Sequence, residues 1–279
     1  MSIPQGKHLL VDGDILRYRC AFAAEKTHYL VGPIDGDFFT VENYKEAKEY
    51  QDEDDTHIWT RKEVQPVEFA FQAINTTLEG LVNLFNPSDV SIFLSSPSNF
   101  RNAVATTKPY KGNRDNVQKP KHYRDCGEFL LSRGAIVLDG LEADDALGIY
   151  ASRDRDGTII ISIDKDLDQI AGHHYNWVNR EYYKVGQRAA DIFLHTQILT
   201  GDSTDNIPGL PGCGKISAAS LLKGAKSTKD LHDIVKGAYL KHFEGDEVKA
   251  SEYFKEQSEL CFIWRNQPDS YSATYCGKA

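Results

Sequence analysis

The run Thr158-Ile-Ile-Ile-Ser-Ile163 is the most strongly strand-like stretch of the chain, and Asp164 follows it directly. A continuous run of β-branched residues is typical of a parallel strand that is buried on both faces. His8-Leu-Leu-Val-Asp12 shows the same pattern, an apolar run that stops at an aspartate. We therefore expect both segments to be strands of one parallel sheet, each with a carboxylate at its carboxyl end.

Further strands are expected at Val90–Leu94 and Ala135–Leu138, with helical segments between the strands. The clearest helix is expected over Pro66–Phe85 and ends at Asn86-Pro87. Its apolar residues recur at helical spacing, at Val67, Phe71, Ile74, Leu78, Leu81 and Phe85. Strands that alternate with helices predict an α/β fold, with a mostly parallel central sheet flanked by helices. Ligands of such folds bind outside the carboxyl ends of the strands.

Two domains are expected. Residues 1–190 carry the strand pattern of an α/β core, and residues 191–279 have the helical pattern of a subdomain punctuated by proline and glycine. Residues 25–64 interrupt the core as an acidic insertion that includes Asp52, Glu53, Asp54 and Asp55. The insertion is interpreted as a solvated excursion, with a DNA-mimicking or partner-binding surface as the alternative.

The 279 residues, 41% of them hydrophobic, suffice for one large core or for a core with a smaller satellite. No apolar run approaches the roughly 18 residues that a membrane helix needs, and the polar N-terminus argues against a signal peptide. A cytoplasmic location without a membrane partner is therefore expected. The five cysteines form no Cys-x-x-Cys pair, so neither a disulfide framework nor a thiolate zinc site is expected.

Acidic residues fall in four groups, each at an expected strand end or helix start. The groups are Asp12; Glu142, Asp144 and Asp145; Asp164 and Asp166; and Asp202 and Asp205. Any one group has a plain explanation as a helix cap or a turn. Together on one rim they would repel strongly unless cations lay between them. Magnesium prefers such oxygen ligands, and two ions about 4 Å apart would suit phosphodiester hydrolysis.

Basic residues gather in one segment although the net charge of the chain is −9. They are Arg101, Lys108, Lys111, Arg114, Lys119, Lys121 and Arg124, interrupted by Tyr110 and Tyr123. Such a run is usually a solvated surface. Beside a metal rim, however, its cations would hold a scissile phosphate, and its aromatic rings would stack an unpaired base.

Gly209-Leu-Pro-Gly-Cys-Gly214-Lys215 matches the spacing of a nucleotide-binding P-loop up to the lysine. Ile216 stands where that loop needs Ser or Thr for magnesium, and no strand is expected before it. A hairpin between two helices is the better interpretation. Its glycines would let backbone amides approach a DNA phosphate, and Ser217 would begin the second helix.

Four motifs, in this order and spacing, resemble those of the 5′-nucleases. This family includes bacteriophage 5′→3′ exonucleases, flap endonucleases and the 5′-nuclease domain of bacterial DNA polymerase I. The motifs are Tyr110-Lys-Gly-Asn-Arg114, Leu141-Glu-Ala-Asp-Asp-Ala146, Ser162-Ile-Asp-Lys-Asp-Leu-Asp168 and Gly201-Asp-Ser-Thr-Asp-Asn-Ile-Pro-Gly-Leu-Pro-Gly-Cys-Gly214. The resemblance implies a magnesium-dependent enzyme of DNA replication or repair that cuts DNA near a 5′ end or flap.

The resemblance also implies roles for individual residues. The first Mg²⁺ would be bound by Asp12, Glu142, Asp144 and Asp145, and the second by Asp164, Asp166, Asp202 and Asp205, with Mn²⁺ as a substitute. The catalytic cations would be Lys111, Arg114 and Arg101. The DNA-binding residues would be Lys108, Tyr110, Lys119, Lys121 and Arg124 in an arch over about 101–133, and Gly212, Gly214, Lys215 and Ser217 in a helix–three-turn–helix over about 198–223. Potassium commonly occupies that hairpin in the family.

The chain departs from the family pattern at three places, one of which is the acidic insertion at 25–64. Ser95 and Ser96 stand where an acid usually precedes Phe100-Arg101, and the hairpin lysine usually lies where Ile216 stands. Two alternatives to a DNA nuclease therefore remain. One is a PIN-type or RNase H-like ribonuclease, for which an RNA–DNA hybrid is the candidate substrate. The other is a non-catalytic protein that binds structured DNA.

Overall fold

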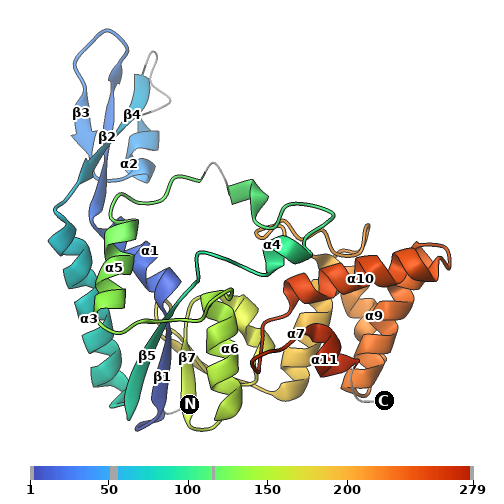
Figure 1. Ribbon diagram of the computed structural model, residues 1–279. Coiled ribbons are helices and arrows are strands. Elements are labelled where there is room, and N and C mark those ends of the chain that lie inside the picture. The colour runs from blue at the N-terminus through green and yellow to red at the C-terminus, as the bar shows by residue number, and fades with distance from the viewer. Residues whose placement is uncertain (1–2, 51–55, 115–116, 277–279) are drawn as a thin grey trace. The chain divides into compact units, whose positions relative to one another are not determined.

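The computed structural model describes residues 3–50, 56–114 and 117–276 (Figure 1). The chain divides into two compact units. The first unit contains Met1–Ile15, Val82–Gln118 and Gly134–Ala279, and the second contains Leu16–Leu81 and Lys119–Arg133. Both the central sheet and the helices after residue 190 fall in the first unit, so a domain boundary near residue 190 stays a prediction.

A six-stranded sheet lies at the centre of the first unit, in the order β6-β5-β1-β7-β8-β9. Its strands are β1 (His8–Asp12), β5 (Asp89–Leu94), β6 (Ile136–Val137), β7 (Thr158–Ile161), β8 (Gly172–Asn176) and β9 (Glu181–Val185). All neighbouring strands are parallel except β8 and β9. The structure thus confirms the mostly parallel sheet and the four predicted strands, and it adds β8 and β9, which were not predicted.

The register of the sheet brings the carboxyl ends of three strands level. Val11 of β1 pairs with Ile92 of β5 and with Ile161 of β7, so Asp12 lies between Phe93 of β5 and Ser162, the residue that follows β7. The next residue, Gly13, begins α1 (Gly13–Ala23). A Cβ atom on Gly13 would lie 2.6 Å from the carbonyl oxygen of Phe93, so only glycine fits this turn.

Helices pack against the sheet of the first unit and against one another. They are α4 (Arg101–Val104), α6 (Ala143–Arg153), α7 (Gln187–Thr200), α8 (Lys215–Leu222), α9 (Thr228–His242), α10 (Glu247–Cys261) and α11 (Tyr271–Tyr275), with the 3₁₀ segments η1 (Gly112–Arg114) and η2 (Lys165–Gln169). Helix α6 shares a buried cluster with the sheet that includes Leu10, Phe93, Ala146, Leu147 and Ile160. Burial of this apolar face fixes the N-terminus of α6 at the carboxyl edge of the sheet.

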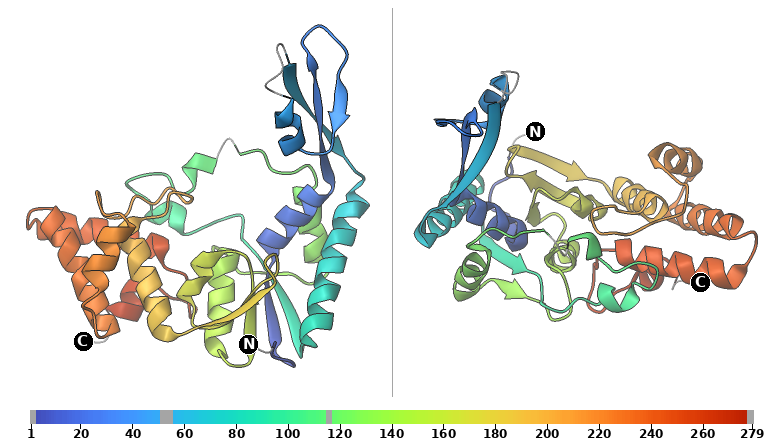
Figure 2. Two further views of the ribbon diagram at one scale, coloured as in Figure 1. Left: turned by 180° about the vertical axis from the view of Figure 1, so that it is seen from behind. Right: turned by 90° about the horizontal axis from the view of Figure 1, so that it is seen from above.

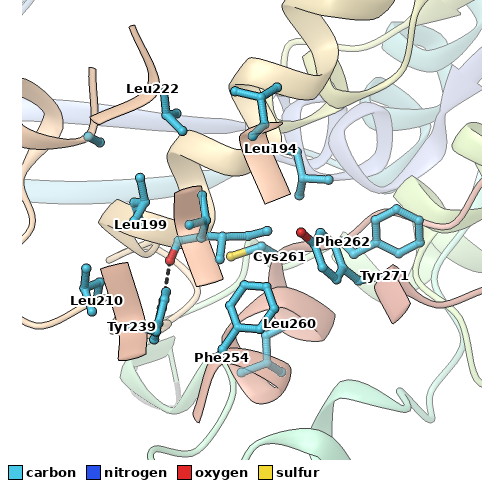
Figure 3. Close-up of a cluster of buried hydrophobic side chains, with 14 of the residues drawn as sticks. Leu194, Leu199, Leu210, Leu222, Tyr239, Phe254, Leu260, Cys261, Phe262 and Tyr271 are labelled. Atoms are coloured by element: carbon cyan, nitrogen blue, oxygen red, sulfur yellow. Dashed lines mark hydrogen bonds between the residues drawn. The ribbon is translucent and has the colours of Figure 1, made fainter. Parts of the chain in front are cut away.

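The helices after β9 gather around a second buried cluster (Figure 3). Helices α7, α9 and α10 pack against one another (Figure 2). Leu194, Phe254 and Tyr271 come from three of the helices and are buried together. The hydroxyl of Tyr239 donates a hydrogen bond to the carbonyl oxygen of Ile198 at 2.6 Å, which satisfies its polar atom inside this core.

The second unit is more ordered than the sequence suggested. The expected solvated excursion at 25–64 contains an antiparallel sheet in the order β3-β2-β4, formed by β2 (Glu25–Pro33), β3 (Phe39–Val41) and β4 (Thr56–Val64). Helix α2 (Tyr44–Glu49) covers it over a small core of Val31, Val41 and Ala47. The four acidic residues Asp52, Glu53, Asp54 and Asp55 lie outside the described residues.

Helices complete the second unit. The predicted helix over Pro66–Phe85 is confirmed as α3 (Val67–Phe85), and α5 (Tyr123–Ser132) packs on it through stacked rings of Phe71 and Phe129, 4.3 Å apart. The part of the chain described here contains no helix long and apolar enough to span a membrane.

Candidate active site

The acidic segments after β1 and β7 meet at the carboxyl edge of the sheet. Asp12 ends β1, and its Oδ2 accepts a hydrogen bond from Ser162 Oγ at 2.7 Å. The same hydroxyl accepts a hydrogen bond from the backbone N–H of Asp164 at 3.0 Å. Asp164 Oδ1 in turn accepts one from the N–H of Asp166 at 2.9 Å. Ser162 therefore ties the ends of two neighbouring strands together and holds their carboxylates side by side.

Asp144, in the first turn of α6, joins these carboxylates. Burial raises the pKa of Asp144 well above its ordinary value, and the nearby charges of Asp12 and Asp164 raise it further. Burial also raises the pKa of Asp12 to about 7, with the charge of Asp14 as the next cause. Burial and the charge of Asp164 raise the pKa of Asp166 to about 8. These shifts are typical of like charges crowded where water screens them poorly.

Asp202 and Asp205 approach the same carboxylates from the loop that follows α7. The name rim is used below for the carboxylates of Asp12, Glu142, Asp144, Asp164, Asp166, Asp202 and Asp205. The backbones of Asp202 and Ile207 exchange hydrogen bonds of 2.9 and 2.8 Å, which close this loop. Gly201 begins it with a φ of 68°, and a Cβ there would lie 2.2 Å from the carbonyl oxygen of Ile207. The charges of Asp202 and Asp205 contribute to the raised pKa of Asp166, and both side chains line one pocket with Asp166, Asp144 and Glu142.

Lys111 and Tyr110 contact two carboxylates of the rim. Lys111 Nζ donates a hydrogen bond to Glu142 Oε1 at 2.5 Å and lies 3.6 Å from Asp205 Oδ2. Burial alone would lower the pKa of Lys111, but Glu142 and Asp205 raise it overall. The Tyr110 hydroxyl lies 2.7 Å from Glu142 Oε2 and 2.9 Å from Asp205 Oδ2. Since a phenol has one proton, it donates to only one of them at a time.

Arg114 lies along the loop that carries Asp205. Its Nη2 donates a hydrogen bond to Asp205 Oδ1, and its Nε donates one to the carbonyl oxygen of Thr204 at 3.1 Å. The backbone N–H of Lys111 donates to the carbonyl oxygen of Asp205 at 2.9 Å. The segment with Lys111 and Arg114 is therefore bound to the Asp205 loop by main-chain and side-chain contacts.

Arg101 and Asp145 form a buried ion pair beside the rim, and Arg101 Nη1 also lies 3.4 Å from Glu142 Oε2. Arg101 is 3% exposed and Asp145 is fully buried, and two parallel hydrogen bonds of 2.7 and 2.9 Å join them. The other contacts of the guanidinium include the carbonyl oxygens of Leu260 and Phe262, and Asp145 also accepts from the N–H of Trp264. Sequence analysis expected a metal ligand and a catalytic cation here. Both expectations stay predictions, and the contacts with protein groups favour a structural part for this ion pair.

Three polar residues that the sequence analysis missed support the rim. Gln197 Nε2 donates to Asp166 Oδ1 at 2.7 Å, and Gln169 Nε2 donates to Gln197 Oε1 at 2.6 Å. Ser162 is the third, through its contacts with Asp12 and Asp164. Of the three, only Ser162 interrupts an apolar run, and that signal does not reveal its partners.

Ser95 and Ser96, which stand where the family usually has an acid, have different environments. Ser95 Oγ accepts a hydrogen bond from the N–H of Ala143 at 2.9 Å and so caps the start of α6. Its own N–H donates to Asp14 Oδ2 at 3.3 Å. Ser96 is half-buried, with its hydroxyl 3.1 Å from that of Ser98. The segment therefore positions α6 but adds no carboxylate to the rim.

The residues of the rim line a pocket of about 30 Å³, which has space for about two water-sized species. Its acidic lining residues are Glu142, Asp144, Asp166, Asp202 and Asp205. Among the residues described, no three Asp, Glu, His or Cys side chains are arranged as a ready metal-binding group. Lys111 and Arg114 hold two of the carboxylates. The donor chemistry nevertheless fits a hard divalent cation, because buried carboxylates with raised pKa values need positive charge.

The hairpin predicted from the glycines connects α7 and α8. Gly212 has a φ of 77°, and Gly214 is the N-cap residue of α8. Gly212, Gly214, Lys215 and Ser217 are all exposed, and Ile216 is 89% exposed. The backbone amides at the start of α8 are thus presented together with one lysine, an arrangement suited to an anionic ligand.

The predicted basic residues divide between the two units. Lys108 is exposed in the first unit. Lys119, Lys121 and Arg124 are exposed in the second, where Lys119 Nζ lies 4.6 Å from the ring centre of Tyr123. An arch formed by 101–133 as a whole stays a prediction.

Comparisons with known sequences find relatives over part of the chain. No family model matches it. A 5′-3′ exonuclease of Buchnera aphidicola is 30% identical over 187 residues, which are 58% of this chain and 63% of that protein. DNA polymerase I of Pseudomonas aeruginosa is 36% identical over 134 residues, 41% of this chain and 14% of that protein. Flap endonuclease Xni of Shewanella sediminis is 27% identical over 48% of this chain and 56% of its own length. The chain thus spans less than two thirds of each relative.

Solved structures share the fold over almost the whole chain. The T5 D15 protein, crystallised with metal ions, superimposes with a TM-score of 0.55 at 15% identity, over 91% of this chain and 90% of its own. A mutant of the T5 5′-exonuclease gives a TM-score of 0.50 at 15% identity, over 92% of this chain and 100% of its own. In sequence the chain is therefore a relative of proteins named 5′-3′ exonuclease and flap endonuclease, and it has the fold of the T5 5′-exonuclease.

Proposed function

We propose that the chain is a structure-specific 5′ nuclease that hydrolyses DNA phosphodiester bonds with two divalent metal ions. One observation carries the proposal. Carboxylates from four distant chain segments converge beside Lys111 at the carboxyl edge of the sheet. Such a group of buried acids destabilises the fold unless it binds cations. Groups of this kind are typical of functional sites. The sequence relatives named 5′-3′ exonuclease and flap endonuclease support the same activity.

The metal ligands are proposed among the carboxylates of the rim. We propose that Asp12, Glu142 and Asp144 serve one ion, and that Asp164, Asp166, Asp202 and Asp205 serve the other. Magnesium, with manganese as a substitute, is the ion that suits an all-oxygen donor set. When bound, such ions lower the pKa of a water and stabilise the leaving oxygen. Asp145 has another part, since its ion pair with Arg101 fixes the first turn of α6, where Glu142 and Asp144 lie.

Lys111 and Arg114 act on the substrate in this proposal. Both are paired with Glu142 or Asp205 in the structure. A metal ion on those carboxylates would compete with the two cations for the same oxygens. Lys111 and Arg114 would then turn to the phosphate, where a charge aimed at the developing negative charge lowers the barrier. The hydroxyl of Tyr110 would orient one of the same two carboxylates, Glu142 or Asp205, by donating its single proton.

DNA binding is assigned to exposed groups. We propose that the amides of Gly212 and Gly214, with Lys215 and Ser217, contact phosphates of duplex DNA, and that potassium can occupy this hairpin. Lys108 in the first unit, and Lys119, Lys121 and Arg124 in the second, would contact the strand with the 5′ end. The substrate is DNA with a 5′ end or flap, in the cytoplasm of the cell that holds it. An RNA–DNA hybrid is the second candidate substrate.

A cleavage assay on end-labelled duplex, 5′-flap and RNA–DNA hybrid substrates tests this function. With magnesium, the wild-type chain should release products from the 5′ end of DNA. Asp144→Asn and Asp164→Asn should lose cleavage but keep DNA binding, because each removes a metal ligand and no phosphate contact. Asp156→Asn is the matched control, since its side chain is 85% exposed and pairs with Lys184. Full magnesium-dependent cleavage by Asp144→Asn would contradict the proposed site.

A further inference from the structure

The last two turns of α10 contain an unusual run of buried polar residues. Glu256, Gln257, Ser258 and Glu259 are each less than 9% exposed. Three of them accept hydrogen bonds from the backbones of other segments. Gln257 Oε1 accepts from the N–H of Gly209 at 3.0 Å, and Glu259 accepts from the N–H of Tyr271 at 2.9 Å. Buried carboxylates are retained where they satisfy such donors, so this run organises neighbouring loops.

Glu256 holds the segment that leads to Lys111. Its Oε1 accepts hydrogen bonds from the backbone N–H groups of Thr106 and Thr107 at 2.6 and 2.7 Å. Its Oε2 accepts one from the hydroxyl of Thr107 at 2.5 Å. All three donors therefore converge on one buried carboxylate, and charge-assisted bonds of this kind are stronger than neutral ones.

The attachment is close to Lys111 along the chain. Only Lys108, Pro109 and Tyr110 separate Thr107 from Lys111. Lys111 has a φ of 56°, which is unfavourable for a residue with a side chain and needs support from its surroundings. The Asp205 loop supplies one support, because the carbonyl oxygen of Asp205 accepts from the Lys111 N–H. Glu256 supplies another support at the start of the segment.

Helix α10 thus binds both loops that meet at Lys111. Glu256 fixes the Thr106–Thr107 segment, and Gln257, the next residue, fixes Gly209 just after the Asp205 loop. We propose that Glu256 is a positioning residue that sets the place of Lys111 at the carboxylate rim. The proposal rests on the proposed function for its effect on catalysis, but its effect on the segment is independent of that function.

The test compares Glu256→Ala and Glu256→Gln with the control Glu252→Ala, which removes an exposed glutamate one turn earlier on the same helix. Hydrogen–deuterium exchange should show faster exchange at the amides of Thr106, Thr107 and Lys111 in Glu256→Ala alone. Single-turnover cleavage by Glu256→Ala should fall on the order of 10²-fold, the cost of a misplaced catalytic group. DNA affinity should stay within about threefold of the wild type, because the substitution displaces Lys111 but removes no contact with a phosphate.

Two further measurements separate positioning from general damage. Glu256→Gln keeps a carbonyl oxygen for the two backbone donors, so it should recover most of the lost rate. In the Lys111→Ala background, Glu256→Ala should add little, because it acts through Lys111. Full additivity of the two rate losses, or unchanged exchange at Thr106 and Thr107, would overturn the proposal. If the wild type cuts none of the substrates, the proposed function fails, while the exchange data still decide whether Glu256 holds the segment.

Discussion

At the scale of single residues, Lys111 has the most distinctive environment of the site. It is held between Glu142 and Asp205, whose charges raise its pKa despite burial. We expect Lys111→Ala to slow single-turnover cleavage about 10²- to 10³-fold with a modest loss of DNA affinity, because its charge acts mainly in the transition state. Lys229→Ala is the control, since it removes a lysine that is 82% exposed, pairs with Asp233 on α9 and has no proposed contact with DNA. Equal cleavage rates for wild type and Lys111→Ala would rule out this role.

For Arg101 we predict an effect on the free energy of unfolding, in contrast to the effect of Lys111 on the cleavage rate. Replacement by alanine leaves Asp145 buried without its partner, and breaking such a pair costs about 3–5 kcal/mol of unfolding free energy. We expect urea denaturation of Arg101→Ala to show a loss of this size. Arg124→Ala, which breaks an exposed pair with Glu128, should lose less than about 1 kcal/mol. A loss no larger in Arg101→Ala than in Arg124→Ala would contradict the assignment of Arg101 to the fold.

These residues show what sequence could and could not reveal. Asp12 and Asp164 were predictable because each directly follows an apolar strand, and the carboxyl ends of parallel strands share one edge. The role of Arg101 was not predictable, because its partners Asp145 and Leu260 are 44 and 159 positions away. Glu256 lies in a helix whose other acids include the exposed Glu247 and Glu252, so its burial had no local signal.

At the scale of elements, the C-terminal helices carry a buried histidine whose titration should be measurable. His195 of α7 has its Nδ1 2.6 Å from the carbonyl oxygen of Asp191 and its Nε2 3.2 Å from the Tyr271 hydroxyl. Burial lowers the pKa of His195 from 6.5 to about 4. The unfolded chain therefore takes up a proton at a higher pH than the folded chain does. The contribution of the neutral His195 imidazole to the free energy of unfolding is complete above about pH 6.5, and it is lost as the pH falls toward 4.

Denaturation at several pH values tests this prediction. Between pH 7 and 5, titration of His195 should cost the wild type about 2 kcal/mol of unfolding free energy. The uncharged variant His195→Gln should lose less over the same interval, because it cannot take up the proton. Parallel pH profiles for the two proteins would show that the imidazole is not held neutral by burial.

Element boundaries were predictable where a pattern is local and long. Helix α3 follows a strong apolar period, and β7 follows an unbroken β-branched run. Strands β8 and β9 were missed because histidine and tyrosine interrupt their pattern. The sheet β3-β2-β4 was missed because most of β4 is exposed, so its sequence looks like a charged loop.

At the scale of the whole molecule, the central claim is that acids far apart in the chain form one site because divalent cations neutralise them. Because the cations bind the folded chain and not the unfolded chain, they must raise the free energy of unfolding by mass action. It must also relieve the repulsion that raises the pKa values of Asp12, Asp144 and Asp166. This effect belongs to the assembled rim, since no single segment supplies enough ligands.

Thermal unfolding with and without magnesium, at pH 8 and constant ionic strength, measures this effect most directly. Saturating Mg²⁺ should raise the Tm of the wild type by several degrees, since about 2–3 kcal/mol of binding energy shifts a chain of this size on that order. EDTA should reverse the shift. Asp144→Asn and Asp164→Asn should show little shift, whereas Asp156→Asn should behave as the wild type. No shift in the wild type, or an undiminished shift in Asp144→Asn, would contradict the account.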